Sequence, residues 1–308
     1  MTECCDTNIM PSSKVVALED SAVQTNVSGV NGGSVNNGAS LPNGNDADIL
    51  DSSKMGVEYF GLRFIFDHET IDNIIHQCIK EKKVGYVCAL DGNNFSHSQR
   101  LPEHLKVLNS SIVNNCDSVW VPKTINWIYG TNYRNYCASD LFFKFVGMRR
   151  YKQFFLGSSK RVLSGLKNQM KNIDPAIVDM RFEELPYCNL EDFDYKSIAA
   201  MINEDAPDII WISLGAPKQE QFMYRLKPYL KSGLMFGVGA IFNFYSGLDD
   251  VPKRAPKWVI NLGMEWVYRV FSEPKKQIKR VLNIIHDLPI AVNNELKKKK
   301  SRQKGKKK

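Results

Sequence analysis

The stretch "PDIIWISLGAPKQEQFMYRLKPYL", residues 207–230, indicates the fold of this chain. Residues 208–215 are a short run of β-branched and aromatic residues that ends in glycine, which is typical of a buried parallel strand. The residues from Pro217 onward combine apolar and charged side chains in a pattern that favours a helix. A strand that leads directly into a helix is half of a βαβ unit.

The same alternation recurs along the chain. Short apolar runs predict further strands at residues 84–90, 118–121, 152–157, 176–182 and 234–239. Amphipathic stretches between them predict helices at residues 158–173, 190–206 and 217–230. The series predicts an α/β fold, a Rossmann-like, doubly wound, mostly parallel sheet. In such sheets, ligands bind beyond the carboxyl ends of the strands.

The two ends of the chain differ from this core. Residues 1–54 are rich in Ser, Asn and Gly, so we expect a disordered leader. It has no apolar or Arg-rich targeting pattern, which favours a cytoplasmic location. We expect an α/β domain at 55–248, a basic amphipathic helical appendage at 249–292 and a lysine-rich tail at 293–308. No run reaches the roughly 18–20 apolar residues of a membrane span, so any membrane contact is expected to be peripheral.

The net charge of +8 is concentrated at the C-terminus. Residues 297–308 carry nine Lys and Arg and no acid, and subtracting nine from +8 leaves −1 for residues 1–296. Such a tail is a solubilising end, or a site for anionic lipid or nucleic acid. No recognition-helix signal accompanies it, which disfavours nucleic acid as a partner. The seven cysteines lack metal-ligand spacing, so no metal site is expected.

The appendage combines apolar and basic residues. Pro256 fits a helix start and Pro274 a break, while Ile278, Leu282 and Ile285 fall on one helical face with lysines around it. Two interpretations remain open: a helical cap that packs on the edge of the sheet, or an interfacial helix that faces anionic lipid.

Two glycine turns are candidates for phosphate binding. "FLGSS" (155–159) contains Gly157, and "FGVGAIF" (236–242) contains Gly237 and Gly239. A glycine before a helix N-terminus presents N–H groups and a positive dipole end, which suit a phosphate. Each turn alone is equally explained by packing.

Five motifs occur in order: "FLG", "LGAPKQE", "GVGAIFNFYSG", "KRAPKW" and "GMEWVYRVFSEP". Together they resemble the WecG/TagA/CpsF glycosyltransferases, glycosyltransferase family 26, over roughly residues 57–285. The resemblance implies a metal-independent, inverting enzyme without a cofactor. It would move an N-acetylmannosamine-type or related sugar from a UDP donor to a lipid-diphosphate-linked acceptor at the inner face of the membrane, in surface-polysaccharide assembly. The appendage would aid docking to an anionic membrane and closure over the nucleotide.

The resemblance also implies site residues. Gln219 would line the active site as a catalytic residue, and Glu220 would hold it or touch the sugar, although an acidic first-turn residue of a helix also explains Glu220. Arginines would stabilise the diphosphate leaving group. The substrate-binding candidates are Asn93, Asp140, Gly157, Gly215, Lys218, Glu220, Gly237, Gly239, Asn243, Arg254, Arg269 and Arg280.

The front half departs from the family pattern. Ala89 and Asp91 stand at its threonine and asparagine, and Pro122 and Lys123 at the Asp-Gly that follows its second strand and supplies the general base. Asp91, at the end of the first core strand, is the predicted replacement base; the alternative is an ordinary turn former.

The loss of the Asp-Gly pair also favours a second hypothesis, a non-catalytic relative that binds nucleotide sugar as a scaffold or regulatory subunit. The sequence leaves open which sugar is used and whether the chain forms a homo-oligomer.

Overall fold

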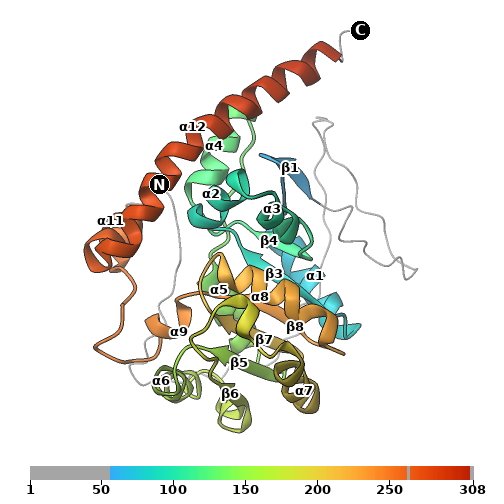
Figure 1. Cartoon of the computed structure of the whole chain (residues 1–308), viewed down its shortest axis with the longest axis vertical. Helices are drawn as coiled ribbons and strands as arrows, with labels where there is room; N and C mark the ends of the chain where they lie inside the picture. The colour runs from blue at the N-terminus through green and yellow to red at the C-terminus, as the bar shows by residue number, and fades with distance from the viewer. Residues whose placement is uncertain (1–55, 262–263, 306–308) are drawn as a thin grey trace, which may run out of the picture. The chain divides into compact units, whose positions relative to one another are not determined.

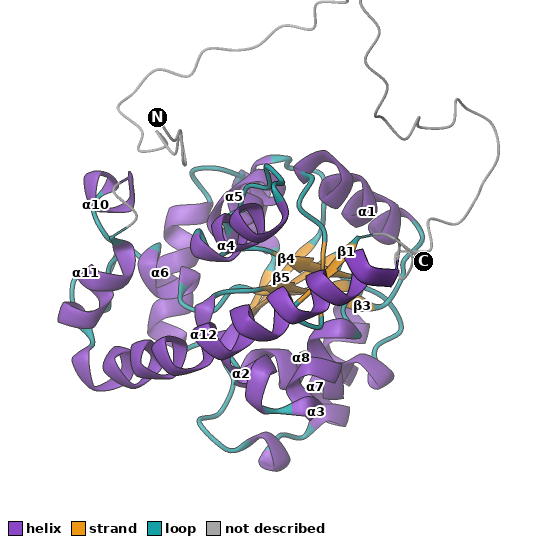
Figure 2. Ribbon diagram, turned by 90° about the horizontal axis from the view of Figure 1, so that it is seen from above, coloured by secondary structure: helices purple, strands orange, loops and turns teal. Residues whose placement is uncertain are grey.

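A six-stranded parallel sheet forms the centre of the chain (Figures 1 and 2). The computed structural model describes residues 56–261 and 264–305, so the expected leader at 1–54 lies outside the described residues. The strand order is β4-β3-β8-β7-β5-β6, and every neighbouring pair is parallel. The strands are β3 (Gly85–Ala89), β4 (Val113–Asn115), β5 (Gln153–Gly157), β6 (Arg181–Glu183), β7 (Ile209–Ser213) and β8 (Leu234–Gly237). β1 (Val57–Tyr59) and β2 (Leu62–Phe64) form a separate antiparallel pair.

Helices cover both faces of the sheet. One apolar core lies under α2 (Gly92–Arg100), α3 (Pro102–Asn109), α4 (Trp120–Tyr129), α7 (Tyr195–Asp205) and α8 (Lys218–Leu226). The other core lies under α1 (His68–Lys80), α5 (Ala138–Gly147), α6 (Lys160–Met170) and α9 (Ile241–Phe244). Short 3₁₀ turns are η1 (Pro175–Asp179), η2 (Leu190–Asp192) and η3 (Lys227–Tyr229). The predicted doubly wound α/β class is therefore confirmed.

The central strand β7 explains why an apolar run predicted this sheet. All five of its residues are buried. Ile210 and Ile212 point into the first core, while Ile209 and Trp211 point into the second. A strand covered on both faces has no water-facing side, so its sequence is apolar throughout and does not alternate.

The strand predicted at 118–121 was wrong. The second strand of the central sheet in chain order, after β3, is β4. The segment predicted as a strand lies where α4 begins. Asn114 and Asn115 made β4 look polar, but both are buried and donate side-chain hydrogen bonds to backbone carbonyls of Arg63 and Leu108, and of Tyr136. The apolar residues after it serve a helix, because Val121, Ile125 and Ile128 share one buried helical face.

The strand predicted at 176–182 is also shorter than expected. Residues 175–179 form the 3₁₀ turn η1, and the edge strand β6 begins only at Arg181. Asp174 caps this turn by accepting from the Ala176 N–H at 3.0 Å. A local side-chain cap has therefore favoured a turn over an extended strand.

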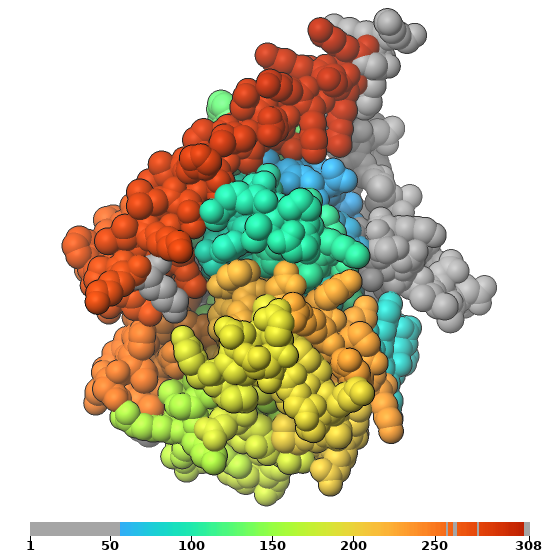
Figure 3. All heavy atoms as spheres, in the orientation of Figure 1, coloured from blue at the N-terminus to red at the C-terminus, as the bar shows by residue number. Residues whose placement is uncertain are grey.

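Three helices end the chain: α10 (Lys257–Asn261), α11 (Glu265–Ser272) and α12 (Pro274–Gly305). The break expected at Pro274 is confirmed, since α11 ends at Ser272 and α12 begins at the proline. α12 continues across residues 292 and 293, where we expected the appendage to give way to a tail. Its residues lie along those of the first third of the domain in the space-filling view (Figure 3).

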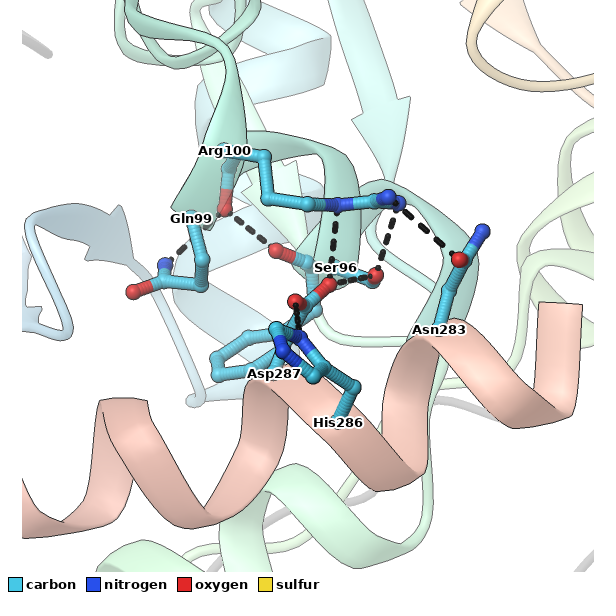
Figure 4. A network of polar contacts seen from close by, with 8 residues as sticks. Ser96, Gln99, Arg100, Asn283, His286 and Asp287 are labelled. Carbon is cyan, nitrogen blue, oxygen red and sulfur yellow. Dashed lines mark hydrogen bonds and ion pairs between the residues drawn. The ribbon is translucent and has the colours of Figure 1, made fainter.

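Two buried carboxylates hold α12 in place. Asp287 contacts α2: it accepts from the Ser96 hydroxyl and pairs with the Arg100 guanidinium at 3.0 Å (Figure 4). Glu295, further along the same helix, accepts from the Phe60 N–H at 2.8 Å and from the Tyr129 hydroxyl at 2.7 Å. The two acids are 3% and 2% exposed. Because a buried carboxylate must be hydrogen-bonded, these contacts fix the register of α12.

We expect Asp287→Ala to lower the free energy of unfolding by about 1–2 kcal/mol. It removes hydrogen bonds to a charged group, and the loss is reduced because Arg100 is partly exposed and can turn to water. Urea denaturation at fixed pH measures the change. His286→Ala is the control, because His286 bonds Asp287 from an exposed position and its loss should cost less than about 0.5 kcal/mol. Equal losses for the two variants would contradict this account of the contact.

The outward face of α12 is apolar. Ile278, Leu282, Ile285 and Ile290 are all largely exposed, Leu282 by 60% and Ile285 by 63%. In the same helix, Asp287 and Glu295 are buried. An exposed apolar row beside buried acids is the reverse of an ordinary surface helix. None of the helices in the described residues is long and apolar enough to cross a membrane.

Candidate active site

Polar groups from four strand ends, three sets of side chains and one backbone N–H, meet at one edge of the sheet. β3 is followed by Asp91 and Asn94, β4 by Asp117, β7 by Gln219 and Glu220, and β8 by Gly239. Neighbouring parallel strands end at the same edge, so these groups gather there. Hydrogen bonds link Asn94 to Glu220 and Gln219 to Gly239. This edge is the candidate site.

Gln219 and Glu220 form a buried pair at the start of α8. The Gln219 amide donates to Glu220 Oε1 at 2.8 Å, and its Oε1 accepts from the Gly239 N–H at 2.9 Å. Glu220 is the acidic residue in the first turn of α8, as the alternative interpretation expects, and it has no exposed surface. Burial is the largest cause that raises the pKa of Glu220, to about 7, while the amides of Gln219 and Asn94 lower it.

The two glycine turns are shaped by close packing. Gly157 has φ +103°, and a Cβ there would lie 2.7 Å from the Ser213 carbonyl oxygen. A Cβ on Gly237 would lie 3.0 Å from Gln219 Nε2. The Gly239 N–H donates to Gln219 and is therefore already used within the protein. Gly215 has φ +78°, and Asn243 accepts from the Ser158 hydroxyl at 3.4 Å.

Asp117 is an acid of the site that the sequence interpretation missed. It follows β4 and is partly buried, and it accepts from the Ala138 N–H at 2.8 Å, at the start of α5. Removal from water raises its pKa to about 6; the Ala138 bond and Arg254 lower it, and the charges of Asp91 and Glu265 raise it. A carboxyl with such a pKa can both hold and release a proton near neutral pH.

Asp91 has a structural task in the same place. It is the N-cap of α2 and accepts from the Asn94 N–H at 2.8 Å, as expected of a turn former. Its neighbour Asn93 donates to the Ala216 carbonyl at 3.1 Å and so ties this turn to the β7–α8 turn.

Arg254 lies beside this acidic cluster. It is half-buried and donates to the Tyr245 hydroxyl at 2.7 Å. Burial lowers its pKa, but Tyr245 and Glu265 outweigh that effect, so the net shift is upward and the guanidinium stays charged. Arg269 lies over the Phe244 ring, 5.1 Å from its centroid. Arg254 thus acts on Asp117 at the strand ends, and Arg269 contacts α9, which follows β8.

Comparison with known proteins agrees with this arrangement. The sequence model of the glycosyl transferase WecG/TagA/CpsF family matches residues 57–304. The chain belongs to this family. It is 30% identical over 148 residues to an N-acetylglucosaminyldiphosphoundecaprenol N-acetyl-beta-D-mannosaminyltransferase of Bacillus subtilis (strain 168), covering 47% of this chain and 54% of that protein.

A protein of the same name from Bacillus spizizenii (strain ATCC 23059 / NRRL B-14472 / W23) is 29% identical over 136 residues, covering 44% of this chain and 49% of the relative. The chain therefore spans about half the length of the curated relatives it matches.

The position of β4 corrects where we placed the Asp-Gly of the family pattern on this sequence. We placed the Asp-Gly of the family pattern on Pro122 and Lys123, which was wrong because it required a strand at 118–121. The residues that follow the observed second strand are Cys116, Asp117 and Ser118. Asp117 is thus the acid that follows the second strand of the central sheet, with Ser118 beside it.

The structure also places the candidates Lys218, Arg280 and Asp140. Lys218 donates to the Cys188 carbonyl and lies 4.9 Å from the Phe193 ring centroid, so its charge is directed to the loop after β6. Arg280 is on α12, where its charge helps to lower the pKa of His97 on α2, behind burial and Arg100. Asp140 is in the first turn of α5, two residues after Ala138. Within the described residues, no three His, Cys, Asp or Glu side chains cluster as a metal site would require.

Proposed function

We propose that this transferase is an inverting, metal-independent enzyme that moves an N-acetylmannosamine-type sugar from a UDP donor to a lipid-diphosphate-linked acceptor in surface-polysaccharide assembly. The observation that carries the proposal is the Asp117 carboxyl beside Arg254 at the strand ends, in a chain of this family. One group can take a proton and the other can bind a diphosphate. The names of the two Bacillus relatives support this choice of sugar and acceptor.

Asp117 is the proposed general base. Its carboxylate takes the proton of the acceptor hydroxyl while that oxygen bonds to the anomeric carbon. The bond from this carbon to the UDP oxygen breaks, and its electron pair leaves with the diphosphate. Attack opposite to the leaving group inverts the anomeric configuration. We place Asp117 ahead of Asp91, because Asp91 already caps α2.

Arg254 and Arg269 are proposed to stabilise the leaving diphosphate. A guanidinium is permanently charged and can bind two phosphate oxygens at once. The Tyr245 hydroxyl accepts from Arg254 and so directs it. Stabilisation of charge that develops only as the bond breaks raises the turnover number more than the affinity for the donor.

The aspartate after β4 also weakens the case for a non-catalytic relative. That hypothesis depended on the absence of the Asp-Gly aspartate, and Asp117 supplies a carboxylate in the corresponding place. Transfer is therefore the function we prefer.

We propose that the protein works at the inner face of the cell membrane and that the outward face of α12 touches anionic lipid. An exposed apolar row flanked by Lys275, Lys279 and Arg280 suits the boundary between lipid headgroups and acyl chains. The exposed Lys297, Lys298 and Lys300 would add electrostatic attraction.

The double substitution Leu282→Ser and Ile285→Ser should weaken binding to anionic vesicles by roughly tenfold or more. Each side chain would lose about 1.5–3 kcal/mol of burial in the interface. Vesicle sedimentation measures the change, and Tyr187→Ser, at an exposed residue outside the appendage, is the control. Unchanged sedimentation of the double variant would remove α12 from the membrane contact.

Donor binding is tested by screening UDP-sugars for thermal stabilisation of the purified protein. A ligand at about 100 times its dissociation constant should add about 2.7 kcal/mol to stability. Stabilisation by UDP-N-acetylmannosamine or a related UDP-sugar supports the proposal. Equal stabilisation by unrelated nucleotides, or none by any UDP-sugar, would count against a UDP donor.

A further inference from the structure

A chain of buried hydrogen bonds runs from α3 through the site. His104 Nε2 lies 3.1 Å from Asn94 Oδ1, Asn94 Nδ2 lies 3.0 Å from Glu220 Oε1, and Gln219 continues from Glu220 to the Gly239 N–H. All four side chains are almost completely buried. Solvent water therefore does not reach these groups and cannot replace a lost hydrogen-bond partner.

Two backbone groups show which atom donates and which accepts in each hydrogen bond of this series. The Gly239 N–H can only donate, so Gln219 must turn its oxygen to Gly239 and its nitrogen to Glu220. The Ala89 carbonyl can only accept, and Asn94 Nδ2 bonds to it at 3.0 Å. Asn94 must then present its oxygen to His104, and His104 must carry its proton on Nε2.

The environment of His104 agrees with this assignment. Burial lowers the pKa of His104 to about 4, with His97 as a lesser cause, so the ring is neutral at physiological pH. A neutral ring with its proton on Nε2 has an unprotonated Nδ1, and that atom is buried with no hydrogen-bond partner among the described residues. In the part of the chain that the structure describes, the hydrogen bond of this ring is the one to Asn94.

We propose that His104 and Asn94 are positioning residues that hold the buried Gln219–Glu220 pair in place and, through Gln219, the turn that follows β8. Asn94 also donates its backbone N–H to Asp91, so it ties the end of β3 to that of β7, and Gln219 ties β7 to the turn after β8. Neither His104 nor Asn94 needs to touch the substrate. The proposal rests on the proposed function for its kinetic consequence and on the hydrogen bonds alone for its structural one.

The test compares His104→Leu, which removes the donor, with His104→Gln, whose amide nitrogen can replace Nε2. We expect His104→Leu to speed hydrogen exchange of the Gly239 amide at least tenfold. It should also lower kcat by about 10–100-fold, with KM within a few-fold and the pH profile unmoved, because the loss is one of geometry. His104→Gln should restore both within about threefold.

Val107→Ala is the matched control, because Val107 is buried in the same helix and lies outside the hydrogen-bonded chain. It should lower stability and change neither Gly239 exchange nor kcat. Should His104→Leu fail to fold, His104→Asn replaces it, since its shorter amide does not reach Asn94.

The proposal would be overturned if His104→Leu kept wild-type exchange of the Gly239 amide and wild-type turnover. It would also be overturned if Val107→Ala changed both quantities as much as His104→Leu does. Hydrogen exchange can be measured whether or not the protein transfers sugar. If His104→Leu speeds exchange of the Gly239 amide while the parent protein transfers no sugar, the positioning role is supported and the proposed function is rejected.

Discussion

Asp117→Asn is expected to lower the turnover number by about 10²–10⁴-fold, because an amide cannot take the proton of the acceptor hydroxyl. In the parent protein, kcat/KM should rise with pH through about pH 6, as the Asp117 carboxyl loses its proton. The variant should lack this rise. Initial rates of UDP release between pH 5 and 8 measure both effects.

Asp91→Asn is the matched control. Asparagine is also a good helix N-cap, so this change should keep the fold and reduce turnover far less than Asp117→Asn. If Asp91→Asn is the inactive variant and Asp117→Asn stays within a few-fold of the parent, Asp91 is the base and our assignment is wrong.

Stability gives a second readout of Asp117. Its folded pKa of about 6 lies above its ordinary value of 3.8. The contribution of such a group is complete below about pH 3.8 and is lost as the pH rises through about 6. Asp117→Asn does not ionise, so its stability relative to the parent should improve between pH 4 and 7.

Arg254→Ala should lower kcat by about 10²–10³-fold, because it removes a charge that acts on the leaving diphosphate. Arg254→Lys should recover only part of the loss, since an ammonium cannot bind two oxygens in a plane. Donor affinity should change less than kcat. Single-turnover rates with saturating donor separate the two effects.

Arg161→Ala is the control for the arginine. Arg161 is exposed and pairs with Asp250, so its removal changes the net charge equally but touches no residue of the site. Turnover should stay within a few-fold. A similar loss in both variants would mean that overall charge, and not the position of Arg254, carries the effect.

The sheet could be predicted wherever burial left an apolar record. β7 and β5 are buried along their whole length and are apolar almost throughout. β4 could not be found in this way, because Asn114 and Asn115 are paired with backbone groups far away in the sequence. A polar strand satisfied by long-range partners has no local signature.

The site was predicted in the same uneven way. Gln219 and Glu220 stand in a local motif, and the structure buries both at the strand ends. Asp117 was missed because its register depended on β4. His104 and Asn94 were missed because their roles come from contacts across the fold. Of these three residues, only Asp117 had a local signal in the sequence. It is a carboxylate three residues before Trp120, where α4 begins.

Sugar transfer itself tests the central claim most directly. The purified protein is incubated with UDP-N-acetylmannosamine and a lipid-diphosphate-linked N-acetylglucosamine, with and without a chelator, and the glycolipid is analysed by mass spectrometry. We predict one added N-acetylhexosamine and an equal amount of UDP, dependent on both substrates, resistant to the chelator and lost in Asp117→Asn. An unmodified acceptor across a panel of UDP-sugars, with a protein that binds them, would contradict the account.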